Sequence, residues 1–125
     1  MKIGENDQEY KICYNKLMID LNKQHCIPCE GGAKPLSKEE AEAILAFTYG
    51  WTLVDDGKKI SKDFVFADFK EAMVFVNKVA EISESEGHHP DIFVWWNKVT
   101  LVLWTHAVGG LTTNDFIIAA KINDL

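Results

Sequence analysis

Two segments that favour β-structure are separated by only two residues, and this spacing limits the fold more than any other feature of the chain. Residues 91–96 and 99–106 are rich in Val, Trp and Thr, which are common in strands. Asn97 and Lys98 lie between them, and a two-residue loop joins antiparallel strands into a hairpin. We therefore expect an antiparallel sheet whose strands reverse at these two residues.

The length of this loop also predicts which residues face each other. Trp96 pairs with Val99, and further from the loop His89 pairs with His106. Alternate residues then form a wholly apolar face that should contact helices: Ile92, Val94, Trp96, Val99, Leu101 and Leu103. The opposite face carries aromatic side chains and the two histidines.

Three helices are indicated by apolar periodicity and capping residues. The first begins at Ser37, which forms a capping box with Glu40, and it runs to about residue 48. The second begins at Asp68, with Glu71 in the matching position, and it runs to about residue 85. The third follows Thr112, over residues 113–122. Apolar residues cover two sides of the second helix, which favours self-association through it.

The order of the segments gives the fold class. A first pair of strands is expected at residues 51–54 and 60–66, so the helix at 68–85 separates two hairpins. This order predicts an α+β fold, a four-stranded antiparallel sheet with helices packed on one face, in a single domain. An apolar stripe over residues 10–21 predicts an extra N-terminal helix. We therefore divide the chain into an extension of residues 1–23 and a domain of residues 24–125.

The cysteines leave three interpretations open. Cys26 and Cys29 form a CxxC motif beside His25, in a segment dense in Gly and Pro. A structural turn is favoured, because a closed zinc site needs four ligands and no second CxxC pair is present. Zinc binding by His25, Cys26 and Cys29 is the second interpretation, and redox chemistry of the two thiols is the third.

The charge and the distribution of apolar residues argue against two classes of partner. The formal net charge is −6, whereas proteins that bind nucleic acid need clustered Lys and Arg. No segment approaches the roughly 20 apolar residues that span a bilayer. The first ten residues are polar and lack the apolar region of a secretory signal. We expect a cytoplasmic protein that binds neither nucleic acid directly nor a membrane.

Three of the four histidines gather near the predicted hairpin. His88 and His89 precede it, His106 lies at its end, and Glu84 lies one helical turn before His88. Because histidine titrates near neutral pH, such a group suits acid–base catalysis. Structural interpretations remain, since residues 88–90 can form a helix-to-strand corner and His106 can simply end a strand. Metal binding is a rival, although the HEXXH spacing of zinc proteases is absent.

The residues around these histidines resemble the pterin-4a-carbinolamine dehydratases. The resemblance rests on residues 84–90, Glu-Ser-Glu-Gly-His-His-Pro, followed by Trp96, His106 and Asp115. It extends through Gly50-Trp51, residues 64–69 and residues 110–112, and so covers about residues 24–125. The aspartate at position 115 would by itself be read as a capping residue in the first turn of the last helix.

The resemblance implies an enzyme, a hydro-lyase. It removes water from 4a-hydroxytetrahydropterin to give the quinonoid dihydropterin, in the recycling of tetrahydrobiopterin, without a metal or another cofactor. It also implies dimers or tetramers. The implied site comprises catalytic His88, His89 and His106 and substrate-binding Glu84, Trp51 and Asp115. Among the histidines we assign acid–base roles to His88 and His106. Asn114 departs from the family, in which a basic residue often stands there.

A non-catalytic binding module is the alternative. Some relatives of this family act as dimerisation partners of transcription factors, and others assist the assembly of a carbon-fixing enzyme. Such a role does not need the complete set of histidines, so their presence favours the enzyme.

Overall fold

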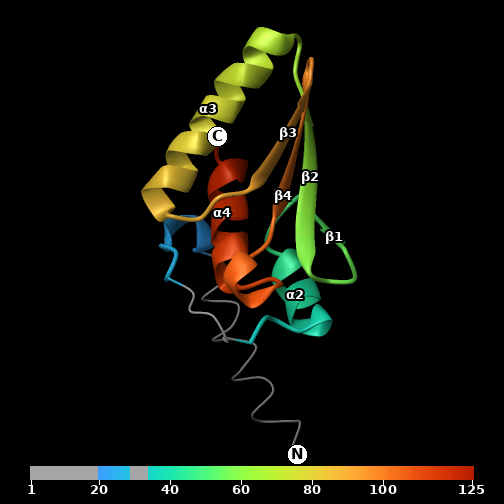
Figure 1. Ribbon diagram of the computed structural model, residues 1–125, viewed down its shortest axis with the longest axis vertical. Coiled ribbons are helices and arrows are strands. Elements are labelled where there is room, and N and C mark those ends of the chain that lie inside the picture. Colours follow the sequence, from blue (N-terminus) through green and yellow to red (C-terminus); the bar gives the residue numbers. More distant parts are fainter. Residues whose placement is uncertain (1–19, 29–33) are drawn as a thin grey trace, which may run out of the picture.

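The computed structural model describes residues 20–28 and 34–125 (Figure 1). The helix expected over residues 10–21 lies almost entirely outside these ranges. The described elements follow in chain order: η1 (Leu21–Lys23), α2 (Lys38–Leu45), β1 (Thr52–Val54), β2 (Lys59–Val65), α3 (Phe69–Glu86), β3 (Asp91–Trp95), β4 (Lys98–Leu103), η2 (His106–Val108) and α4 (Thr113–Asn123). Both η elements are single turns of 3-10 helix.

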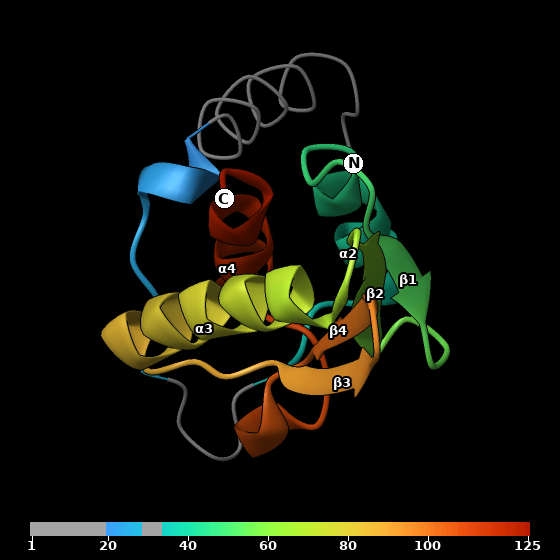
Figure 2. The same cartoon turned by 90° about the horizontal axis from the view of Figure 1, so that it is seen from above.

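The strands form one sheet in the order β1-β2-β4-β3, with every neighbouring pair antiparallel. Helices α3 and α4 lie on the same side of the sheet (Figure 2). Four sheet residues that point to this side are fully buried: Ile60, Val99, Leu101 and Leu103. On the other side Val65 and Trp95 are exposed. The predicted α+β fold with helices on one face is confirmed.

The register of the second hairpin differs from the expected one. The loop consists of Trp96 and Asn97, so Val94 pairs with Val99 and not with Leu101. Trp96 adopts a positive φ of 39°, and Asn97 is bonded to the end of β2 through both its backbone carbonyl and its side-chain amide. This anchor places the turn one residue earlier. The pairing shifts by two positions, so the strand residues keep their predicted faces. Trp96, which we expected on the face toward the helices, lies in the loop instead and is 66% exposed.

The predicted helix starts agree with the observed caps, with one difference. Ser37 and Glu40 form a complete capping box at the start of α2. At α3 the Asp68 side chain accepts from the Glu71 N–H, but the Glu71 carboxylate accepts from Ala67 and not from Asp68. The buried face of α3 consists of Ala72, Phe75, Val79 and Ser83. The rest of α3 faces outward over much of its length.

The segment before residue 28 lies against the main body. Leu21 is buried in the core, the Lys121 ammonium donates to the Asn22 carbonyl, and the Asn22 amide donates to Asp124. Figures 1 and 2 show this segment, drawn in blue, passing the C-terminal end of α3. Residues 21–23, which we assigned to the extension, therefore contact α4. The division between residues 23 and 24 stays a prediction.

Within the described part of the chain, no helix is long and apolar enough to cross a membrane.

Candidate active site

A cavity of about 380 Å³ lies where the end of α3, the end of β4 and the start of α4 meet. His88, His89 and His106 all line it, together with Trp104 and Asn114. Cys26, Ile27 and Pro28 close another part of its surface. The structure therefore brings together the three histidines that the sequence placed near one hairpin.

The route by which the histidines meet differs from the predicted one. The ladder between β3 and β4 ends at the pair of Asp91 and Val102, so His89 and His106 are not opposed in the sheet. His89 lies in the loop after α3, and His106 begins the single turn η2. The corner at Gly87 has a φ of 65°, where glycine is favoured, and it ends α3 so that the chain turns into the cavity.

His88 is held by a fully buried carboxylate. Its Nε2 lies 2.6 Å from Asp115 Oδ1, and the two side chains are 12% and 0% exposed. Asp115 Oδ2 also accepts from the Thr105 hydroxyl at 2.7 Å and from the Thr112 N–H at 3.0 Å. Asp115 thus completes the capping box of α4 and fixes one imidazole at the same time.

This contact selects a tautomer of His88. A proton on Nε2 is donated to the carboxylate, and in the neutral ring Nδ1 then carries the lone pair. An imidazole oriented by a buried carboxylate is the arrangement that proteins use to prepare a histidine for proton transfer.

The other two histidines are held more loosely. His89 Nε2 lies 2.8 Å from Glu84 Oε2, and both of these side chains are exposed. The His106 ring lies over Trp104 with 3.9 Å between ring centroids. Trp104 is fixed in turn, because its Nε1–H donates to Asp91 at 3.0 Å. Trp104 is one of the aromatic side chains that the sequence placed on the face of the histidines, where a flat ring can stack against them.

Two of the predicted substrate contacts lie elsewhere. Trp51 is buried in the core, where its Nε1–H donates to Asn123 Oδ1, and it does not line the cavity. Glu84 is outside the cavity lining as well, and it reaches the site only through His89. Asp115 lies behind His88 and holds that ring.

Residues 25–28 are attached to the site by two side chains. Glu86 Oε1 accepts from the Cys26 N–H at 3.0 Å, and Glu86 Oε2 lies 2.9 Å from His25 Nδ1. Asn114 accepts from the Ile27 N–H at 2.9 Å and donates to the Ile27 carbonyl at 2.5 Å. No local pattern in the sequence indicated this docking, since the partners lie 60 and 87 residues apart.

The Glu86 side chain is only 4% exposed. Burial would raise its pKa, but the hydrogen bonds from His25 and Cys26, with the charges of Lys121 and His25, outweigh burial and hold the pKa below its usual value. The carboxylate is therefore stabilised by the segment that it anchors.

Cys29 lies outside the described residues, so the zinc and redox interpretations of the CxxC motif stay predictions. Within residues 20–28 and 34–125, no group of three His, Cys, Asp or Glu side chains is arranged to hold a metal ion.

A cavity with three histidines and an orienting carboxylate is suited to acid–base chemistry on a small molecule. Comparison with known sequences gives the class. The chain belongs to the family described as pterin 4 alpha carbinolamine dehydratase, whose model matches residues 34–125.

Individual relatives agree with this assignment. A protein of Chlorobaculum tepidum, provisionally named a pterin-4-alpha-carbinolamine dehydratase, is 46% identical over 110 residues, covering 86% of this chain and 99% of that protein. A protein of Nitrosomonas eutropha with the same provisional name is 49% identical over 109 residues, covering 86% of this chain and 95% of that protein.

Solved structures share the fold. A transcriptional coactivator/pterin dehydratase from Brucella melitensis has a TM-score of 0.69 and 34% identity, covering 73% of this chain and 97% of that one. A pterin dehydratase-like protein identified as a RuBisCO assembly factor of the alpha-carboxysome has a TM-score of 0.53, covering 61% of this chain and 88% of that one. At 21% identity, the second likeness concerns the fold alone.

Proposed function

We propose that this chain is a dehydratase that removes water from 4a-hydroxytetrahydropterin and releases the quinonoid dihydropterin, as a step in recycling tetrahydrobiopterin. The observation that carries the proposal is the buried pair of His88 and Asp115 on a cavity shared with His89 and His106. Membership of the dehydratase family supports the choice of substrate.

The reaction needs only proton transfers. The bond between the ring carbon and its hydroxyl breaks, and the hydroxyl takes up a proton and leaves as water. The neighbouring ring nitrogen loses a proton, and its electron pair forms the new carbon–nitrogen double bond. One proton is donated and one accepted, so no electrons leave the substrate. Each positioned acid or base contributes about 10²–10⁴-fold to such a rate.

The geometry supports a division of roles among the histidines. His88 is the base, because Asp115 holds its Nε2 and stabilises the imidazolium that forms when Nδ1 takes a proton. His106 is the acid that protonates the leaving hydroxyl. His89, steadied by Glu84, positions the substrate ring. Trp51 has no part in this assignment, since it lies in the core.

The test is to follow loss of the carbinolamine with wild type, with the double variant His88→Ala/His106→Ala, and with buffer alone. We expect the double variant to fall by at least about 10²-fold toward the buffer rate. A matched double control, Tyr49→Ala/Val65→Ala, removes two exposed side chains outside the cavity and should keep the wild-type rate. Equal rates for wild type and buffer would refute the dehydratase activity. Full activity of the single variant His106→Ala would refute the role of His106 as the acid.

We also propose that the chain self-associates as a dimer or tetramer through α3. Phe69 and Val74 on this helix are half exposed, although both are apolar. Light scattering at micromolar concentration should give a mass of at least two chains, and Val74→Asp should lower it. A monomeric wild type would refute this proposal.

A role as a binding module can coexist with catalysis. The protein from Brucella melitensis is described as both a transcriptional coactivator and a pterin dehydratase, which supports this second function. A module without catalysis would bind its partner equally well after His88→Ala/His106→Ala, whereas the dehydratase would lose its rate.

A further inference from the structure

We infer that residues 26–28 form a substrate-binding wall of the cavity, in which Ile27 contacts the pterin ring and Glu86 and Asn114 position the segment. This inference rests on the proposed function and names a determinant of substrate affinity. The wall lies outside residues 34–125, which are the part matched by the family model.

The position of the wall is the first argument. Cys26, Ile27 and Pro28 line the same cavity as His88 and His106, so a molecule between the histidines meets this segment as well. Ile27 is 73% exposed, which leaves an apolar side chain in water beside a site for a flat bicyclic ring. Covering such a side chain with the ring of a ligand is favourable, because apolar surface leaves water on both partners.

The attachment of the wall is the second argument. Asn114 bonds both the N–H and the carbonyl of Ile27, which fixes the backbone of this residue as a neighbouring strand would. The Cys26 thiol adds a contact to the Asn114 carbonyl at 3.7 Å. A segment held in this way loses little further freedom when a ligand binds, so more of the contact energy appears as affinity.

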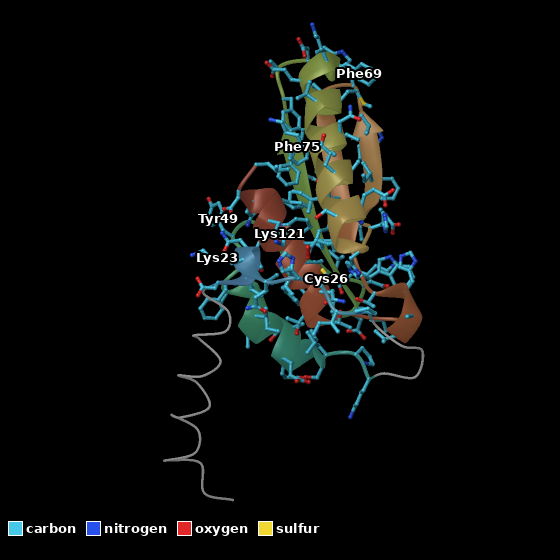
Figure 3. All side chains as sticks on the ribbon, turned by 90° about the vertical axis from the view of Figure 1, so that its left-hand side faces the viewer. Lys23, Cys26, Tyr49, Phe69, Phe75 and Lys121 are labelled. Atoms are coloured by element: carbon cyan, nitrogen blue, oxygen red, sulfur yellow. The ribbon has the colours of Figure 1, made fainter. Side chains whose placement is uncertain are left out.

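The location of the two anchors is the third argument. Glu86 precedes His88 by two residues at the end of α3, and Asn114 precedes Asp115 by one residue at the start of α4. The same two backbone segments therefore carry the His88–Asp115 pair and hold the wall. Figure 3 shows Cys26 near this end of α3, opposite to the end that carries Phe69.

An apolar wall has a defined kinetic consequence. It contacts the part of the ring that does not react, so it stabilises the bound substrate and the transition state equally. Such uniform binding lowers KM and leaves kcat unchanged.

The central experiment compares Ile27→Ala with Val65→Ala, a matched control whose side chain is 72% exposed on the other face of the sheet. We measure kcat and KM for the carbinolamine, and the Kd of biopterin, a non-reacting pterin, by fluorescence titration. For Ile27→Ala we expect KM and Kd to rise by about five- to tenfold, with kcat within about twofold of wild type. Val65→Ala should leave all three constants unchanged.

The anchors are tested as positioning residues. Asn114→Ala and Glu86→Ala should raise KM and Kd as Ile27→Ala does, while Glu86→Gln keeps an acceptor for the Cys26 N–H and should stay close to wild type. The double variant Ile27→Ala/Asn114→Ala should bind biopterin no more weakly than the weaker-binding single variant. Both changes remove the same contact with the ligand, so their effects on Kd do not add. A merely structural loss would lower the active fraction without changing Kd.

The outcomes separate this inference from the proposed function. Unchanged KM and Kd in Ile27→Ala would refute substrate binding by residues 26–28 and would leave the proposed dehydratase activity unaffected. A wild type that binds biopterin without turning over the carbinolamine would refute the enzyme, and the Kd values would still decide the wall. A wild type that neither binds nor reacts would overturn both.

Discussion

Two adjacent histidines, each paired with a carboxylate, face the same cavity and differ in how deeply the pair is buried. His88 with Asp115 and His89 with Glu84 have nearly the same separation, 2.6 Å and 2.8 Å. Asp115 is completely buried and accepts two further hydrogen bonds, whereas Glu84 is 79% exposed. Because burial differs so much, we expect two pairs of similar length to contribute unequally to the rate and to stability.

The difference follows from solvent. An exposed ion pair is screened by water and typically contributes about 0–1 kcal/mol. A buried carboxylate that loses a hydrogen-bond donor cannot take a water molecule in its place. The donors around such a carboxylate are therefore held in one arrangement. A third pair, Glu86 with His25, lies between these cases, since its carboxylate is buried and its imidazole is exposed.

The largest effect is expected from Asp115→Asn. The Thr112 N–H needs an acceptor, so the amide oxygen of Asn takes the place of Oδ2 and the NH₂ group faces His88 Nε2. His88 must then carry its proton on Nδ1, and the base is lost. We expect kcat to fall by about 10²-fold. Loss of the buried network should also lower the free energy of unfolding by about 1–3 kcal/mol.

Carbinolamine loss and chemical denaturation measure the two parts of this prediction. A kcat within about threefold of wild type would mean that the tautomer of His88 does not control the rate. A lower stability with unchanged kcat would leave Asp115 as a cap of α4 only.

The fold could be predicted because its signals are local. The caps at Ser37 and Asp68 and the alternation along β4 each depend on residues a few positions apart. The loop at Trp96 and Asn97 was placed one residue late, since its position depends on a contact of Asn97 with Phe66 at the end of another strand. Even so the faces of the strand residues were right, because the pairing shifted by two residues, and only Trp96 left its predicted face for the loop.

The site could be predicted only in part. The histidines and Asp115 were named from a family resemblance, but the bond between His88 and Asp115 joins residues 27 positions apart. The docking of Ile27 on Asn114 depends on backbone groups, which every residue carries, so no side-chain pattern announces it. Trp51 had a conspicuous position in the sequence and proved to be a core residue.

A smaller effect is expected at the intermediate pair and depends on pH. The folded pKa of Glu86 lies below its usual value, so its ionised form stabilises the folded chain. This contribution is complete above the unfolded pKa of about 4.3 and is lost as the pH falls through the folded pKa. The difference in unfolding free energy between wild type and Glu86→Gln should therefore decrease as the pH falls below about 4.3.

Urea denaturation at several pH values measures this difference in unfolding free energy. Groups that titrate alike in the two proteins do not contribute to the difference. Glu84→Gln serves as the control, because Glu84 is exposed and its replacement should change the free energy of unfolding little. A difference that grows toward acid would contradict the sign derived for Glu86.

The smallest effect is expected from Glu84→Gln, which is the same chemical change as Asp115→Asn at the exposed pair. The Gln carbonyl can still accept a hydrogen bond from His89 Nε2. Because the pair is exposed, solvating water compensates for the lost negative charge. We expect kcat to stay within about threefold of wild type, and any loss to shrink further at high salt, because exposed charges are screened. A loss near 10²-fold would reverse the comparison, since the exposed histidine would then carry the essential proton and the buried pair would serve only to hold α4 in place.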